Sequence, residues 1–202
     1  MFEPRTVKLK DNKEVLIRAM KREDLEGSFA FFRALPEESR LSLRRDLCIR
    51  EVVEERIREM EEGAVKRLVA VADETIVADG ALEFSHFGWE RHVAELRLFV
   101  ATPYQRKGLG MLMAGALYDL AVSAGIEEIV VKIMARQTAA LRIFQKLGFS
   151  HEAVLRDYVK DMKGTRRDLV LMRCRLEDLW QKYEEFLSET DMRSSSTRGG
   201  VS

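Results

Sequence analysis

A glycine-containing loop separates a strand pattern from a helix pattern near the middle of the chain. Residues 91–100 alternate apolar and polar side chains as a strand does, and residues 108–124 carry apolar side chains at helical spacing. Another apolar strand pattern follows at 127–135. A strand, a helix and a second strand in this order pair the two strands in parallel. The sequence therefore predicts a sheet with a parallel pair at its centre.

Further patterns surround this crossover. Strand patterns occur at 6–18, 66–72, 75–84, 149–161 and 165–176. Helix patterns occur at 21–35, 51–62, 137–147 and 177–189. Short turns between several strands indicate antiparallel hairpins. We therefore expect one α/β (α+β) domain, a mixed, mostly antiparallel seven-stranded sheet with helices on both faces.

Composition excludes several classes of partner. The 202-residue chain carries 34 Lys and Arg against 34 Asp and Glu, so its net charge favours neither nucleic acid nor a membrane surface. Cys48 and Cys174 form no C-x-x-C pattern, so we expect neither a disulfide nor a metal site. The N-terminus has no apolar leader segment, and no 18-residue apolar run occurs. These observations predict a soluble, cytoplasmic protein.

The loop itself, PYQRKGLGML at 103–112, is suited to an anion. A helix N-terminus offers unpaired N–H groups, and Gly108 and Gly110 allow oxygens to approach them closely. A nucleoside triphosphate loop would need Lys where Met111 stands, and a dinucleotide loop would need a third glycine at Met113. A turn that needs glycine only for its geometry explains one of the two glycines. A pyrophosphate is the ligand that explains the whole loop.

This loop resembles the acetyl-coenzyme A binding motif of the GCN5-related N-acetyltransferases (GNAT), Q-x-x-G-x-G, which residues 105–110 match at every defined position. The segment QTAALRIFQKLGF at 137–149 is similar to a second family segment, N-x-x-A-x-x-[LI]-[YF]-x-K-x-G-F. The resemblance implies a GNAT fold over residues 5–175, with the central parallel pair splayed apart. An amphipathic helix at 176–190 and a flexible tail at 191–202 would follow.

The resemblance also implies how acetyl-coenzyme A binds, as a cosubstrate without a metal. Peptide groups of the splayed strand bind the pantetheine arm, and the glycine loop binds the pyrophosphate. Gln137 stands where the family usually has Asn, and Ala140 and Phe144 would lie near the thioester. The implied binding residues are Leu98, Phe99, Val100, Gln105, Arg106, Lys107, Gly108, Leu109, Gly110, Met111, Gln137, Ala140 and Phe144.

The implied reaction is the attack of a neutral amine on the thioester, which needs a base for the incoming ammonium. Glu95 is the predicted catalytic residue, because the family often has a glutamate in this strand. An ordinary ion pair, with Arg97 or with a neighbouring strand, is the alternative interpretation of Glu95. His86, His92 and His151 are the other candidate bases.

The reaction also needs an oxyanion donor and a means to release the thiolate. A backbone N–H near Phe99 or Val100 is the expected oxyanion donor. Many family members have a tyrosine acid where this chain has Phe144, which has no hydroxyl group. Tyr104 and Tyr158 are substitutes that the sequence does not place.

Two functions from different classes follow. The first is an N-acetyltransferase that acts on a primary amine of a protein or a small molecule. Similarity to acetyltransferase domains of bacterial protein lysine acetyltransferases indicates a protein lysine. The second is a sensor that binds acyl-coenzyme A without catalysis, which Gln137 and Phe144 favour. The apolar residues of the helix at 177–189 either fold back or meet a second subunit, so we expect a monomer or a homodimer.

Overall fold

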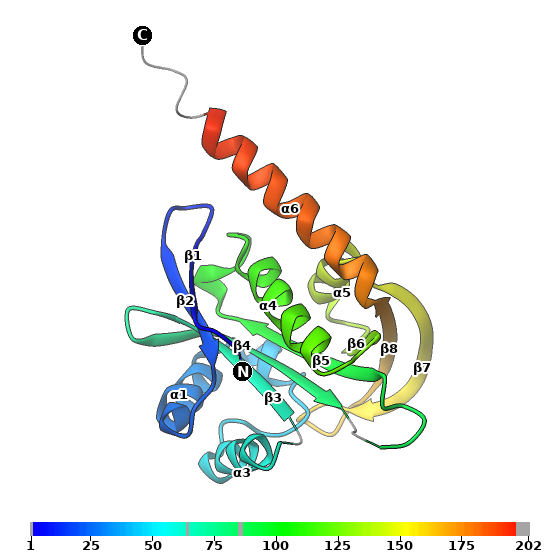
Figure 1. Ribbon diagram of the computed structural model, residues 1–202. Helices are drawn as coiled ribbons and strands as arrows, with labels where there is room; N and C mark the ends of the chain where they lie inside the picture. Colours follow the sequence, from blue (N-terminus) through cyan, green and yellow to red (C-terminus); the bar gives the residue numbers. More distant parts are fainter. Residues whose placement is uncertain (1, 64, 85–86, 197–202) are drawn as a thin grey trace.

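One eight-stranded sheet organises the chain (Figure 1). The computed structural model describes residues 2–63, 65–84 and 87–196. The strand order is β1-β2-β3-β4-β5-β6-β8-β7. The strands are β1 (Arg5–Lys8), β2 (Glu14–Ala19), β3 (Val65–Ala72), β4 (Thr75–Phe84), β5 (Val93–Val100), β6 (Glu128–Met134), β7 (Ser150–Lys160) and β8 (Arg166–Arg175). The helices are α1 (Leu25–Ala34), α2 (Glu37–Arg40), α3 (Arg50–Glu61), α4 (Leu109–Ser123), α5 (Thr138–Lys146) and α6 (Leu176–Ser196).

The predicted mixed sheet with helices on both faces is confirmed, but its strand count is wrong by one. The segment predicted as a single strand at 6–18 forms two, β1 and β2, because the chain reverses around Asn12, whose φ is 66°. α6 is also longer than predicted and ends at Ser196, since no glycine or proline occurs in it. The predicted flexible tail thus begins within a helix, and residues 197–202 lie outside the described residues.

The central parallel pair joins β5 to β6 over a short stretch. Residues Val93–Glu95 pair with Glu128–Val130, whereas all other neighbouring strands in the sheet are antiparallel. Both strands continue beyond this stretch, to Val100 and Met134, without pairing to one another. The splay predicted for the central pair is therefore present, and it opens toward the N-terminus of α4.

The face of the sheet that carries α4 is apolar. α4 packs closely on β4 because Gly80 has no side chain; an added Cβ there would lie 2.9 Å from a methyl carbon of Leu117. α6 packs on α4 in turn (Figure 1), with Trp180 stacked on Tyr118 and Leu179 in the same apolar core. The C-terminal helix thus folds back onto its own chain. No helix in the described part of the chain is long and apolar enough to span a membrane.

The opposite face, under α1 and α3, is apolar in one part and charged in another. Phe32 of α1 is fully buried and meets Phe99 of β5 edge-on, with ring centroids 5.7 Å apart. Beside this cluster, Arg67 of β3 and Asp79 of β4 are buried as well. Charged side chains inside a sheet require partners, so this region is where a site is expected.

Candidate active site

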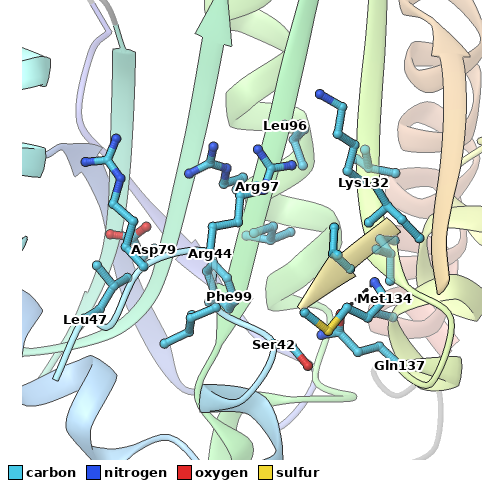
Figure 2. A pocket seen from close by; sticks show the side chains of 18 of the residues that line it. Ser42, Arg44, Leu47, Asp79, Leu96, Arg97, Phe99, Lys132, Met134 and Gln137 are labelled. Carbon is cyan, nitrogen blue, oxygen red and sulfur yellow. Dashed lines mark hydrogen bonds between the residues drawn. The ribbon is translucent and has the colours of Figure 1, made fainter. Parts of the chain in front are cut away.

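A cavity of about 420 Å³ lies where β5 and β6 separate. Its walls include Leu96–Phe99 of β5 and Val131–Met134 of β6. Figure 2 shows Leu96, Arg97 and Phe99 on one strand and Lys132 and Met134 on the next. The rest of the wall comes from residues between 42 and 47, from α3, β3 and β4, from Gln137 and α5, and from the β7–β8 hairpin. The cavity therefore extends from the strand gap to the charged face of the sheet.

Backbone groups of β5 point into the gap. The N–H of Ala101 donates to the carbonyl of Val77 on β4 at 2.9 Å. Successive residues of a strand direct their N–H and C=O groups to opposite sides. Phe99 therefore directs its N–H and C=O groups toward β4, while Leu98 and Val100 direct these groups toward β6. The side chain of Gln105 donates to the Val100 carbonyl at 2.9 Å. Of the two residues expected to provide the oxyanion donor, Val100 faces the gap and Phe99 does not.

The glycine loop leads from the gap into α4. Gly108 precedes the helix with a φ of 91°, a conformation that other residues adopt with strain. A Cβ added at Gly110 would meet no atom within 4 Å outside the backbone of α4, so the space beside the first helical turn is open at this residue, whereas the Phe186 ring would lie 3.1 Å from a Cβ added at Gly108. Lys107 is ion-paired to Asp11 of the β1–β2 turn at 2.8 Å, and Arg106 is exposed. Unpaired N–H groups and this open space fit an anion such as a pyrophosphate.

α5 forms the side of the cavity next to β6. The N–H of Met134 donates to the side-chain oxygen of Gln137 at 3.2 Å, so this amide closes the turn between β6 and α5. Gln137, Ala140 and Phe144, which the sequence analysis names as cofactor-binding residues, all line the cavity. Phe144 also packs edge-on against Phe149, with centroids 5.1 Å apart. The structure thus brings these residues and the splayed strand to one place.

Glu95 is the last residue of β5 that pairs with β6, and the part of β5 that lines the cavity begins at the next residue. Its carboxylate contacts the guanidinium of Arg44, binds Lys132 Nζ at 2.9 Å and lies 3.9 Å from Arg97 Nε. Nearby cations stabilise the charged form of a carboxylate. The ion pairs considered in the sequence interpretation are therefore present, and they involve two partners on other segments.

The two described histidines among the candidate bases, His92 and His151, do not line the cavity. His92 precedes β5, and its carbonyl accepts the N–H groups of Glu127 and Glu128 at the paired end of the two strands. His151 on β7 contacts Gln145, with 3.0 Å between the two Nε2 atoms. His86 lies outside the described residues.

The two tyrosines considered as acids are placed differently. Tyr158 of β7 lines the cavity and is 66% exposed. Tyr104 lies in the loop before α4, where Lys13 and Lys107 sit over its ring. Of the two tyrosines, Tyr158 is therefore the one that the fold brings to the cavity wall.

A buried ion network beside the cavity was missed by sequence reasoning. Asp79 binds Arg56 of α3 at 2.9 Å and lies 3.9 Å from Arg67. Burial, and then repulsion from Arg56, lower the pKa of Arg67 to about 10, so it stays charged at neutral pH. All three residues line the cavity. The signal for two of them was a charged residue inside an otherwise apolar strand pattern.

The cavity combines backbone groups of β5 that face the strand gap with carboxylates and several cations. Among the described residues, no group of three or more His, Cys, Asp or Glu side chains is placed to hold a metal ion. Burial also lowers the pKa of Arg44 to about 10, with repulsion from Arg97 as a second cause. Positive charge is therefore concentrated on the side of the cavity away from α4.

Comparisons with known proteins agree with this geometry. The sequence profile described as Acetyltransferase (GNAT) family matches residues 29–149. The [Ribosomal protein bS18]-alanine N-acetyltransferase of Escherichia coli K12 is 30% identical over 69 residues, 34% of this chain and 46% of the relative. The L-amino acid N-acyltransferase MnaT of the same strain is 31% identical over 113 residues, which are 54% of this chain and 65% of the relative.

The chain thus spans about half the length of the first curated relatives that it matches. Among solved structures, Mycobacterium smegmatis RimJ in complex with CoA-disulfide superposes with a TM-score of 0.75 at 16% identity. The superposition covers 92% of this chain and 93% of that one. At this identity the similarity establishes the fold.

Proposed function

The chain belongs to the GNAT family of acetyltransferases, and we propose that it transfers the acetyl group of acetyl-coenzyme A directly to a primary amine, with both substrates bound together. The observation that carries the proposal is the gap between β5 and β6. It joins the glycine loop on one side to the charged cavity on the other. A thioester held in the gap is accessible to an amine from the cavity.

Acetyl-coenzyme A supplies the activated acetyl group, and this chain's residues hold it. The N-terminus of α4, from Arg106 to Met111, would bind the pyrophosphate through the N–H groups that precede the first helical hydrogen bond, which Met111 donates to the Gly108 carbonyl at 3.1 Å. Leu98 and Val100 would bind the pantetheine arm, as a strand binds its neighbour. Ala140 and Phe144 would border the thioester.

The residues around the gap have roles that follow from their positions. The Val100 N–H would donate to the oxyanion that forms on the acetyl carbonyl. Glu95 would bind the acceptor ammonium in place of one of its present cations and accept its proton, directly or through water. Tyr158 would protonate the departing thiolate. Since a thiol with a pKa near 8.5 leaves readily at neutral pH, a missing acid costs about tenfold to a hundredfold.

The class of acceptor is a separate proposal. Resemblance to the acetyltransferase domains of bacterial protein lysine acetyltransferases supports a protein lysine. The names of the curated relatives support a protein N-terminus or a free amino acid. All three present a primary amine, which is the feature that the proposed chemistry requires.

A direct test measures coenzyme A release from acetyl-coenzyme A with a panel of amines. We expect release that depends on both substrates. Gly110→Glu places a carboxylate in the open space beside the first turn of α4 and would weaken acetyl-coenzyme A binding by roughly 100-fold, while thermal unfolding stays unchanged.

A non-catalytic acyl-coenzyme A sensor is the second candidate function, favoured by the absence of a hydroxyl at Phe144. Tight binding of acetyl-coenzyme A without turnover of any amine, unaffected by Glu95→Gln, would establish the sensor and reject the enzyme. Loss of turnover in Glu95→Gln with unchanged cofactor binding would do the reverse.

A further inference from the structure

We infer that the acceptor carries a carboxylate beside its primary amine, as a free amino acid does, and that Arg67 and Arg97 bind this carboxylate. The inference rests on the proposed function and specifies its acceptor. It is carried by the charged residues of β3, β4 and β5 on the face that lies under α1 and α3.

Register places the two arginines on either side of a small residue. Arg67 pairs with Ala81, and Ala81 pairs with Arg97, so the three side chains form one row across β3, β4 and β5. Two strand spacings separate the arginine Cα atoms by roughly 10 Å. The methyl group of Ala81 leaves space between the long side chains above it. Both arginines line the cavity.

Arg67 is a buried cation that has no hydrogen-bonded counter-ion among the described residues. The residue is 3% exposed, and its Nε has no hydrogen-bond partner. Asp79, the carboxylate that contacts it, lies 3.9 Å away and binds Arg56 instead at 2.9 Å. A buried charge in this state is costly, and a ligand carboxylate would compensate it.

The cavity wall as a whole carries more positive than negative side chains. The lining cations are Arg44, Arg45, Arg56, Arg67, Arg97, Lys132 and Lys160, and the lining carboxylates are Glu59 and Asp79. Adding the adjacent Glu55, Glu83 and Glu95, which pair with several of these cations, gives five carboxylates against seven cations. An anionic acceptor is attracted to this wall, whereas a polyamine is repelled.

The positions also suit the reaction. Arg97 is adjacent to Leu98, whose peptide group faces the gap, and Glu95 lies on the same side of β5 as Arg97. A carboxylate held between Arg67 and Arg97 would therefore keep the neighbouring amine close to both the gap and Glu95. A small amino acid satisfies this spacing because its two groups are separated by one carbon atom.

The test compares each L-amino acid with its carboxamide, which keeps the amine and the side chain but removes the negative charge. Spermidine and a lysine peptide blocked at both ends complete the panel. With saturating acetyl-coenzyme A, we expect kcat/KM of the best amino acid to exceed that of its carboxamide by roughly 10- to 100-fold.

Variants assign the effect to the arginines. Arg67→Gln is expected to raise KM for the amino acid at least tenfold, because it removes a charged hydrogen-bonding partner, while kcat/KM for the carboxamide changes by less than about threefold. Ala81→Val is a second variant, which serves if Arg67→Gln fails to fold. It fills the space between the arginines without removing a charge and is also expected to raise KM for the amino acid. Lys66→Gln, on the other face of β3, is the matched control and leaves KM unchanged.

The outcomes separate this inference from the proposed function. Equal kcat/KM for amino acids and carboxamides, or a preference for spermidine or the blocked peptide, overturns the carboxylate site and leaves amine acetylation intact. An unchanged KM in both Arg67→Gln and Ala81→Val also overturns it. Absence of product with every amine, despite acetyl-coenzyme A binding, overturns both.

Discussion

The two sides of β5 differ in chemistry although they alternate along one short strand. Leu96 and Leu98 point toward α4 and join the apolar core, whereas Glu95, Arg97 and Phe99 point toward α1 and α3. β4 repeats the contrast, because Gly80 lets α4 approach the sheet and the preceding Asp79 is buried in an ion network on the opposite face. The apolar side holds the strands in place, and the charged side is the one that we propose binds the acceptor.

This contrast predicts that neighbouring residues will respond differently to substitution. Changes on the α4 side should act through packing and reduce stability. Changes on the charged side should act through uncompensated charge or through catalysis.

The largest expected effect is that of Asp79→Asn. It removes the carboxylate that binds Arg56 and approaches Arg67, and breaking a buried ion pair in this way costs about 3–5 kcal/mol. Urea unfolding measures the loss. Glu61→Gln, which breaks an exposed pair with Arg22, is the control and should change stability by less than about 0.5 kcal/mol. An equal, small effect of both variants would mean that the ion pair between Asp79 and Arg56 contributes no more stability than an exposed ion pair.

Glu95→Gln should affect catalysis and not stability. Loss of a general base lowers kcat by at least about 100-fold, equivalent to about 2.7 kcal/mol of barrier, with acetyl-coenzyme A binding unchanged. Steady-state kinetics and calorimetry measure the two quantities. Glu128→Gln, in an ion pair with Arg173 at 3.0 Å, is the control and should keep kcat within about twofold. A normal kcat in Glu95→Gln would leave Glu95 as a structural ion-pair residue.

Gly80→Val tests the apolar side at the residue next to Asp79. An added Cβ lies 2.9 Å from Leu117 and 3.1 Å from Met113, so the variant should lose about 1–3 kcal/mol through overpacking. Its cofactor binding should persist below the melting temperature. Unchanged stability would contradict the close approach of α4 to β4.

The smallest effect is a difference in labelling between the two cysteines, one on each side of the sheet. Burial raises the pKa of Cys174 to about 12, so its thiol stays protonated and unreactive up to pH 9. Cys48 is half-buried near Arg40. A thiol reagent should therefore label one cysteine in the native protein and both in denaturant. Labelling of native Cys48→Ser would show that the α4 side is open to solvent.

Local sequence patterns predicted much of the fold. Helical spacing predicted α1, α3, α4 and α5, and alternation predicted the strands, because each of these signals depends on residues close in sequence. The eighth strand was missed because one pattern spanned the turn at Asn12. The end of α6 was missed because its last residues lack a periodic apolar face.

The candidate site was predicted in part. Gly108, Gln137 and Phe144 belong to contiguous motifs, so their neighbourhood followed from the sequence order of strand, loop and helix. Tyr158 could not be placed, because its distance from the gap depends on how the β7–β8 hairpin packs against β6.

By itself the sequence determined most of the elements, the crossover and the glycine loop, since these arise from backbone conformation and side-chain spacing along the chain. Only the tertiary structure decided that Arg67 and Arg97 flank Ala81 and that Glu95 meets Lys132. These contacts join residues from four strands, and their register is fixed by turns and by burial of the opposite face. A shift of one residue would exchange the charged and apolar sides of a strand.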